Sequence, residues 1–383
     1  MKISLHAPKF TGNEIKYVNE CIRTSWLSPA GKFVSVFEKE IAKYTKSKFA
    51  IACINGTAAL HLSLKLAGVN SNDEVIAPTI TFIAPVNAIK YNGAHPIFMD
   101  CDQLGNLDVY KTIEFIKNNT YFKNGFTFNK KTNKKISALI AVHVYGNAID
   151  LEKLVGICKK RNIKIIEDSS ESLGSFFSKG KFKDKHTGTV GFTGCLSFNF
   201  NKVITSGGGG MILTNDKKIA LRAKYLADQA KDDTIKFVHN SVGYNFRLGN
   251  INAAIGLAQF ENLKEILRKK KEIYKIYLNY LKHNKNVIFV KQPEHSNNNI
   301  WLNLIKIKNT KKFNLKKLIK KFLSKKIEVR PVWKCNHLQK PFSQAQKFKI
   351  KKAPILVNNY LCLPSSYFLN KNEILKICNL INE

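Results

Sequence analysis

The sequence predicts an α/β protein with a large domain built on a mostly parallel sheet and a smaller C-terminal α+β domain. Over the first two thirds of the chain, short β-branched runs alternate with helical patterns, which is the order of βαβ units. From about residue 284 the pattern changes to short strands and a Lys-rich helix. With 383 residues, 44% of them hydrophobic, the chain can bury a large core. We expect a large domain at 1–255 and a small domain at 256–383.

Hydrophobic periodicity sets the order of elements in the large domain. We expect helices at 57–68, 84–92, 150–161 and 217–229, and strands at 74–79, 95–100, 138–146 and 163–168. Two further runs, 194–199 and 209–216, predict a strand pair around a turn. The polar residues 117–135 indicate an inserted surface hairpin or loop, and 250–283 predicts a long helical stretch. Strands at 286–290 and 301–307 and a helix near 314–325 belong to the small domain.

The net charge is +36, from 63 basic and 27 acidic residues. A nucleic-acid or anionic-membrane partner is one interpretation of such a balance. However, only six of the basic residues are Arg, and Arg is the residue that reads phosphates and bases bidentately. Evenly spread Lys is typical of solvated faces, so we expect no nucleic-acid partner.

The composition also gives expectations about compartment and metal. No apolar run reaches the length of a membrane span, and the N-terminal residues lack the apolar stretch of a signal peptide. We therefore expect a cytoplasmic protein with no membrane insertion. The eight cysteines form no C-x-x-C pair, so we expect buried thiols and no metal site.

Three segments carry candidate chemistry, and each has a plainer explanation. The turn at 55–57, which opens a helix, can hold an anion on free N–H groups, or Thr57 can simply cap the helix. The strand 163–168 delivers Asp168 to its C-terminal end, to hold a cationic ring nitrogen or to cap the next turn. Lys202 lies between an apolar segment and the glycine run 207–210, as a nucleophilic amine or as one more surface Lys.

Taken together, these segments resemble a known family. N-G-T-A-A-L (55–60), E-D-S-S-E (167–171), S-F-N-F-N-K (197–202) with G-G-G-M (208–211), and G-Y-N-F-R (243–247) are similar, in order and spacing, to the DegT/DnrJ/EryC1/StrS sugar aminotransferases. The resemblance extends from W-L-S (26–28) to C-L-P-S (362–365). It implies a fold-type-I aminotransferase with a seven-stranded large-domain sheet, and pyridoxal 5′-phosphate as cofactor.

The resemblance also implies roles for single residues. Lys202 matches the lysine that bonds to the cofactor, and Asp168 matches the carboxylate that keeps the ring nitrogen protonated. Gly56, Thr57, Ala58 and Ser197 match the positions that bind the phosphate. Phe82 matches the aromatic residue that stacks on the ring, and Glu171 matches a residue near the ring hydroxyl. Asn245 matches a residue that reaches across from a neighbouring subunit. The last of them implies a homodimer with shared sites.

Segments at 129–132, 228–233, 237–240 and 330–333 resemble the subgroup that acts on a UDP-linked 4-keto-6-deoxy-N-acetylhexosamine in bacillosamine and legionaminate synthesis. Many relatives read G-E-G-G where this chain has four glycines, and that subgroup shares the glycine run. His239 and Arg330 are candidate substrate residues there, or else a structural histidine and an exposed ion pair. Trp333 is favoured as core or interface.

The expected reaction transfers an amino group from L-glutamate to C4 of that UDP-linked sugar. One alternative is the same chemistry on another nucleotide sugar, such as a GDP-linked 4-keto-6-deoxymannose of the GDP-perosamine type. A second alternative is a dehydratase, although those relatives replace the lysine at 202 by histidine. A third is a basic regulatory protein on a degenerate scaffold, which the intact Asp168 and Lys202 disfavour.

Overall fold

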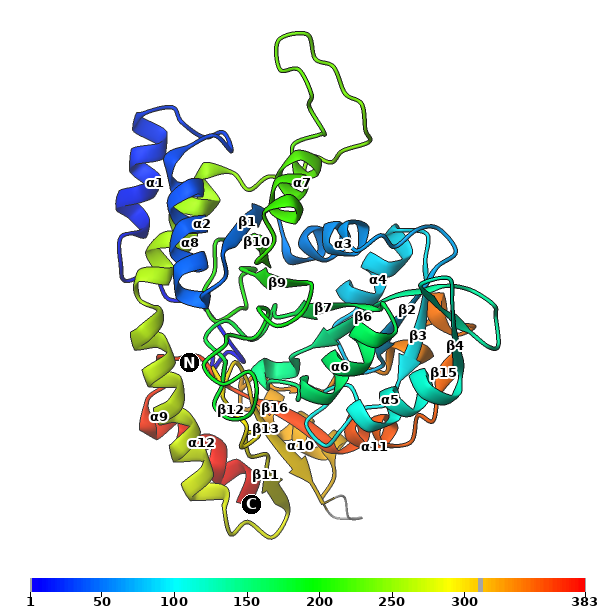
Figure 1. Ribbon diagram of the computed structural model, residues 1–383. Coiled ribbons are helices and arrows are strands. Elements are labelled where there is room, and N and C mark those ends of the chain that lie inside the picture. The colour runs from blue at the N-terminus through cyan, green and yellow to red at the C-terminus, as the bar shows by residue number, and fades with distance from the viewer. Residues whose placement is uncertain (1, 309–312, 383) are drawn as a thin grey trace.

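The computed structural model describes residues 2–308 and 313–382. Its centre is an eight-stranded sheet of order β1-β10-β9-β7-β6-β2-β3-β15 (Figure 1). The strands are β1 (Phe49–Cys53), β2 (Glu74–Pro78), β3 (His95–Met99), β6 (Ile136–Val142), β7 (Lys164–Asp168), β9 (Thr193–Ser197), β10 (Gly210–Thr214) and β15 (Lys347–Phe348). Only β10 runs against its neighbours, so the sheet is mostly parallel, as predicted.

Helices cover both faces of this sheet (Figure 1). One face carries α3 (Gly56–Leu66), α4 (Ala84–Tyr91) and α7 (Lys217–Ala227), and the other carries α5 (Val109–Asn118) and α6 (Glu152–Lys160). Alternation along the strands divides the core in two, because successive side chains point to opposite faces. In β2, Val75 and Ala77 join the first cluster, whereas Ile76 joins the second.

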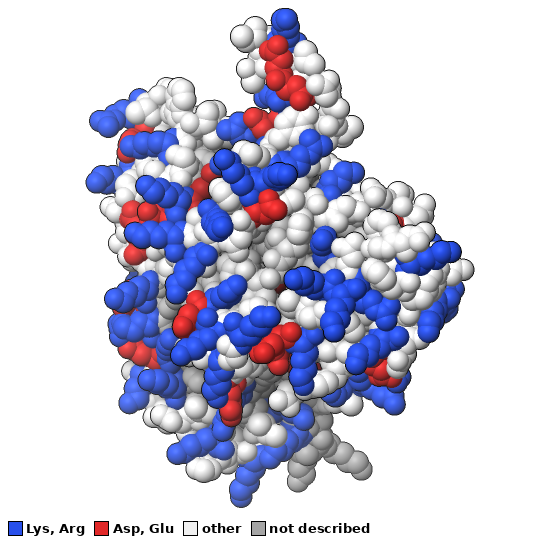
Figure 2. Space-filling view, in the orientation of Figure 1, with Lys and Arg blue, Asp and Glu red and all other residues white. Residues whose placement is uncertain are grey.

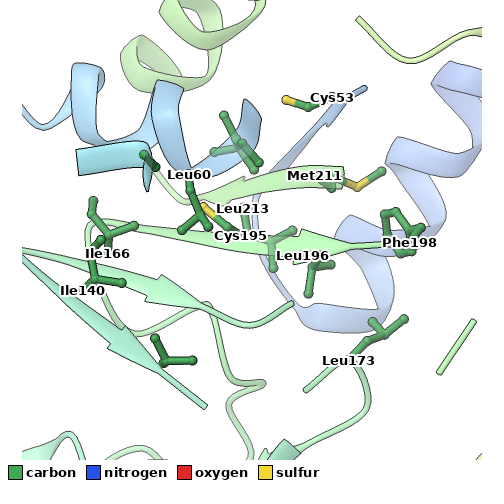
Figure 3. Packing of buried hydrophobic residues seen from close by; sticks show 14 of the residues in the cluster. Cys53, Leu60, Ile140, Ile166, Leu173, Cys195, Leu196, Phe198, Met211 and Leu213 are labelled. Carbon is green, nitrogen blue, oxygen red and sulfur yellow. The ribbon is translucent and has the colours of Figure 1, made fainter. Parts of the chain in front are cut away.

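Figure 3 shows the first cluster near the middle of the sheet. Leu60 of α3 lies over β9 and β10, where Leu196 and Met211 are fully buried. Cys53 and Cys195 belong to the same cluster, and all eight cysteines are buried free thiols, as expected from the sequence. The sheet and α3 therefore form a rigid support for the loops at the strand ends.

The N-terminal helices α1 (Glu14–Arg23) and α2 (Lys32–Thr45) pack on α8 (Asn250–Glu261). A second sheet of order β11-β13-β16-β14 is antiparallel and lies against α9 (Leu263–Leu281), α10 (Leu315–Ser324) and α12 (Lys371–Asn382). Its strands are β11 (Val287–Phe289), β13 (Asn303–Ile307), β14 (Arg330–Pro331) and β16 (Tyr360–Leu363). This α+β part has its own core, which includes Tyr277 and Phe322. The division at residue 255 falls inside α8 and stays a prediction.

Several expected elements differ in detail. The predicted strand 138–146 ends at Val142, because Tyr145 adopts a left-handed backbone (φ 56°) within a short 3-10 turn, Val144–Gly146. The stretch 250–283 is two helices, α8 and α9, which meet at Asn262. Within 117–135 the structure has the hairpin β4 (Thr120–Lys123) and β5 (Phe126–Asn129).

Short elements complete the chain. The strands β8 (Phe176–Phe177) and β12 (Ser296–Asn297) pair with each other, and α11 (Lys352–Asn359) precedes β16. Two 3-10 turns, Asn336–Leu338 and Lys340–Phe342, lead to β15.

A long arm, residues 228–245, projects from the body between α7 and α8 (Figure 1). Three of its large apolar side chains are open to solvent: Ile235 is 85% exposed, Phe237 72% and Val242 83%. Exposed apolar groups gathered on one projection indicate a contact surface.

Lys and Arg side chains are distributed over the whole face shown in Figure 2, with no single basic patch. This distribution agrees with the expectation that the Lys side chains are spread over solvent-exposed faces. Among the described residues, no helix has both the length and the apolar character to cross a membrane.

Candidate active site

A cavity of about 510 Å³ opens at the C-terminal ends of the parallel strands, where open α/β sheets bind ligands. Six segments form its walls: the start of α3 after β1, the segments before α4 and β13, and the residues that follow β7, β9 and β14. Predicted residues that line it are Gly56, Thr57, Phe82, Asp168, Glu171, Ser197 and Lys202. The topology thus brings together residues that are up to 146 positions apart, from Gly56 to Lys202.

The start of α3 forms a compact cradle. Asn55, and not Thr57, caps the helix, since its side chain accepts a hydrogen bond from the Ala58 N–H at 2.8 Å. Because the Ala58 N–H is already bonded to Asn55, and the residue is buried, Ala58 contrasts with the expectation that it serves the phosphate. Gly56 and Thr57 lie in the first turn, where N–H groups have no carbonyl partner in the helix itself.

Glycine is required in this cradle. A Cβ on Gly56 would stand 2.9 Å from the Cβ of Ser197, so the helix start and the end of β9 approach as closely as backbone permits. A Cβ on Gly210 would lie 2.4 Å from the carbonyl oxygen of Asn55. The cradle combines free N–H groups, the positive end of a helix dipole and two hydroxyls, which suits a phosphate group.

The glycine run continues along the cavity wall. Gly208 lines the cavity, and a Cβ there would meet nothing within 4 Å. This is the second glycine of the run, where many relatives have a glutamate. Position 208 therefore has room for a side chain, and the cavity is wider because glycine has none.

Asp168 lies at the end of β7, and its carboxylate is almost fully buried. Its Oδ1 accepts a hydrogen bond from the Ser170 N–H at 3.1 Å. Burial raises the pKa of this carboxyl above its usual range, and the positive charge of Lys202 opposes that rise. A buried carboxyl on the cavity wall is matched to a cationic ring nitrogen, which would favour its charged form.

Lys202 and Glu171 face each other across the cavity floor. The Lys202 Nζ lies 3.7 Å from the Glu171 Oε1, and Glu171 also accepts a hydrogen bond from the Tyr145 N–H at 2.7 Å. Burial raises the pKa of Glu171 to about 7, although Lys202 acts against the rise. The left-handed turn at Tyr145 explains why this N–H points at the carboxylate and not along a sheet.

Phe82 lies in the segment before α4 and is 55% exposed, although it is a large apolar side chain on a cavity wall. Opposite aromatic residues include Trp301 and Trp333, which both line the cavity. The ring of Tyr145 stacks on the Trp333 ring at 4.6 Å. Trp333 packs against the hydrophobic core, as the sequence favoured, and it also lines the cavity.

Besides Ala58, three of the predicted site residues do not line the cavity. Asn245 is exposed at the base of the arm, where it pairs with Asp228. His239 is exposed on the arm, and its Nδ1 donates to the Gln229 carbonyl oxygen at 2.9 Å. Arg330 forms an exposed ion pair with Glu328. For these three, the roles stay predictions.

His143 lies outside this cavity. It is fully buried, with Nε2 3.0 Å from the Glu167 Oε2 and Nδ1 accepting from the Ile149 N–H. Burial alone would raise the pKa of Glu167, but the bond to His143 and the N–H groups of Gly191 and Gly188 lower it. These contacts give His143 a structural role in the buried core.

Comparisons with known proteins agree with this geometry. Residues 8–382 match the DegT/DnrJ/EryC1/StrS aminotransferase family. The chain belongs to this family. It is a pyridoxal-phosphate-dependent nucleotide-sugar aminotransferase, as the resemblance implied.

Individual relatives match over their whole length. A GDP-perosamine synthase of Escherichia coli O157:H7 is 36% identical over 384 residues, covering 100% of this chain and 98% of the relative. Another, of Caulobacter vibrioides, is 33% identical with the same coverage of both chains. The crystal structure of a DegT DnrJ EryC1 StrS aminotransferase from Brucella abortus superposes with a TM-score of 0.86 at 24% identity, covering 96% of this chain and 94% of that one. The fold class predicted from the sequence is confirmed.

Proposed function

We propose that this enzyme transfers an amino group from L-glutamate to C4 of a GDP-linked 4-keto-6-deoxyhexose, giving a GDP-perosamine-type sugar. The observation that carries the proposal is the full-length similarity to GDP-perosamine synthases. The UDP-linked substrate, our first expectation from the sequence, is less well supported. Of the four segments that suggested it, only 330–333 contributes a cavity residue, Trp333.

Pyridoxal phosphate, when bound, supplies an electron sink that lets the carbon bearing the amino group lose its proton. We assign the phosphate to the cradle of Gly56, Thr57 and Ser197, and the ring nitrogen to Asp168. A carboxylate that stays ionised beside this nitrogen keeps a proton on it, because a charge-assisted bond favours the charged pair. Phe82 lies where it can cover the ring and exclude water.

The Lys202 amine is then the group that moves the proton. Its Nζ lies at the cavity floor, and once free it can accept a proton from the substrate carbon and return it to another carbon. Glu171, 3.7 Å away, is placed to balance the charge that Nζ gains. Histidine would not bond covalently to the cofactor, so the lysine favours transamination over dehydration.

The donor and the acceptor use the same site in turn, which gives ping-pong kinetics. The test offers L-glutamate with a GDP-linked 4-keto-6-deoxymannose or a UDP-linked 4-keto-6-deoxy-N-acetylglucosamine, and identifies products by mass spectrometry. We expect amination of the GDP-linked sugar, and none in Lys202→Ala. Exclusive amination of the UDP-linked sugar would return the assignment to the first expectation. A Lys202 that borohydride leaves unlabelled in the cofactor-loaded enzyme would contradict the role of this lysine.

We further propose a homodimer in which Asn245 serves the cofactor of the neighbouring subunit. Asn245 is exposed and does not line the cavity of its own chain. The arm that it terminates carries exposed apolar side chains at 235, 237 and 242, which a second copy of the chain would cover. A shared site of this kind makes the dimer obligatory for activity.

A further inference from the structure

We propose that Trp301 is a positioning residue that holds the Lys202 amine in its reactive place. This inference rests on the proposed role of Lys202 and adds a residue that the sequence motifs did not indicate. Trp301 precedes β13, is 3% exposed and lines the cavity. Its indole ring contacts Lys202 at one end of the side chain and the lysine loop at the other.

Two contacts connect Trp301 to the lysine. The Lys202 Nζ lies over the indole ring, 4.4 Å from its centroid, which is the geometry of a cation–π contact. The indole Nε1–H donates a hydrogen bond of 2.7 Å to the carbonyl oxygen of Asn201, the residue before Lys202. One rigid ring therefore fixes both the amine of Lys202 and the backbone directly before this residue.

The ring itself is held firmly. The Trp301 N–H donates to the Asn299 Oδ1 at 3.0 Å, and its carbonyl oxygen accepts from the buried Lys270 Nζ at 3.1 Å. Lys270 also donates to the Ser365 carbonyl oxygen at 2.7 Å, so it ties the segment before β13 to the segment after β16. With its backbone bonded on both sides, Trp301 has little freedom to follow a moving lysine.

Asn299 links Trp301 to Glu171. While its Oδ1 holds Trp301, its Nδ2 donates to the Glu171 carbonyl oxygen at 2.8 Å. Glu171 and Trp301, the two groups that face the Lys202 amine, are thus bonded to one buried amide. A Cβ on Gly146 would stand 2.0 Å from the Asn299 Oδ1, so the absence of a side chain at Gly146 leaves the space that this amide needs.

The experiment separates positioning of the amine from the shape of the cavity. Pyridoxal phosphate bonds to a lysine, whereas pyridoxamine 5′-phosphate binds the same cavity without that bond. In Trp301→Phe the ring remains but the N–H to Asn201 is lost. We expect covalent capture of pyridoxal phosphate by the cofactor-free protein, followed by visible absorbance in stopped flow, to slow by about ten-fold or more. Affinity for pyridoxamine phosphate, measured by calorimetry, should stay within about two-fold of wild type.

Trp333→Phe is the matched control, because Trp333 lines the same cavity and stacks on Tyr145. It should leave the ratio of capture rate to pyridoxamine phosphate affinity unchanged. Equal losses of capture and affinity in Trp301→Phe, no loss of either, or the same selective loss in Trp333→Phe would overturn the proposal. If Trp301→Phe does not fold, Trp301→Tyr is measured in its place. Failure of the wild-type protein to capture pyridoxal phosphate would instead contradict the role of Lys202.

Discussion

At the scale of single residues, we propose Asp168 as the group on which the cofactor's chemistry depends. It is buried at the end of β7, and burial raises its pKa. A bound ring nitrogen that carries a proton would compensate for this, whereas a neutral amide at the same position could not hold that proton. The negative charge of the carboxylate, and not its size, would therefore keep the proton on the ring nitrogen.

We expect Asp168→Asn to slow the half reaction with L-glutamate by roughly 10²-fold, because the charge that stabilises the ring nitrogen is removed. The measurement is the bleaching of the visible band in a single turnover. Cofactor content should be determined beside it, so that a loss of binding is told apart from a loss of rate. A rate within about three-fold of wild type would contradict the role of this carboxylate.

Glu171 gives a prediction about pH. Its pKa is raised from 4.5 to about 7, mainly by burial, so the folded protein binds its proton more tightly than the unfolded chain. In this window the folded state carries more protons, and the contribution of Glu171 to stability falls as pH rises from about 4.5 to about 7. Below about pH 4.5 Glu171 is protonated in both the folded and the unfolded state, so its burial does not lower the free energy of unfolding through charge.

Glu171→Gln removes the titrating group and keeps the shape. The free energy of unfolding of the cofactor-free protein should therefore decline less between pH 4.5 and 7 in this variant than in the wild type. Urea unfolding at several pH values provides the comparison. Parallel pH dependences in the two proteins would show that burial does not act on Glu171 in this way.

At the scale of elements, we propose that the start of α3 serves both the fold and the cofactor. Asn55→Ala removes a helix cap and should cost about 1 kcal/mol in the free energy of unfolding. It should also weaken binding of pyridoxal phosphate, because the first-turn N–H groups lose their orientation. Denaturant unfolding and a cofactor titration measure the two effects.

The chain offers a matched control at α10. Asn314 caps that helix in the same manner, accepting from the Lys317 N–H at 3.1 Å, and does not line the cavity. Asn314→Ala should cause a similar loss of stability with no change in cofactor affinity. Equal cofactor losses in both variants would trace the effect to general destabilisation.

The elements that the sequence predicted well are those whose pattern is local. Buried runs such as 74–79 and 163–168 predicted strands, because parallel strands are apolar on both faces. The predicted strand at 138–146 was too long, since residues 144–146 are apolar or small although Tyr145 turns left-handed. The N-terminal helices were not predicted, and neither were β1 and β16.

The same distinction holds for the site. Lys202, Asp168 and Glu171 come from segments with recognisable order and spacing, and the structure places all three around one cavity. Trp301 and Asn299 gave no signal, because their importance arises only when a segment about 100 residues downstream folds back on the lysine loop. Thr57 was a candidate cap as an alternative to its phosphate role, but α3 begins at Gly56, so Asn55 occupies the cap position.

At the scale of the whole molecule, shared sites can be tested by mixing damaged subunits. A heterodimer is purified through two different tags, with Lys202→Ala on one chain and Asn245→Asp on the other. If Asn245 reaches the neighbouring site, both defects fall in one site and the other site is intact. About half of the wild-type activity per dimer is then expected.

A heterodimer of Lys202→Ala and Asp168→Asn is the control, because both residues line the cavity of a single chain. Each of its sites carries one defect, so no recovery is expected. An inactive Lys202→Ala and Asn245→Asp heterodimer would place Asn245 with its own chain's site and contradict the shared arrangement.

The sheet pairing also bears on how the chain is synthesised. β15, near residue 348, adds the last strand to the large sheet beside β3, while Ile3 forms a bridge with Ile327 in the C-terminal part. A nascent chain that stops at 255 would leave β3 as an open edge and its first residues without a partner. Such an edge invites pairing between chains. Translation therefore has to pass residue 348 before the β3 edge of the central sheet is covered.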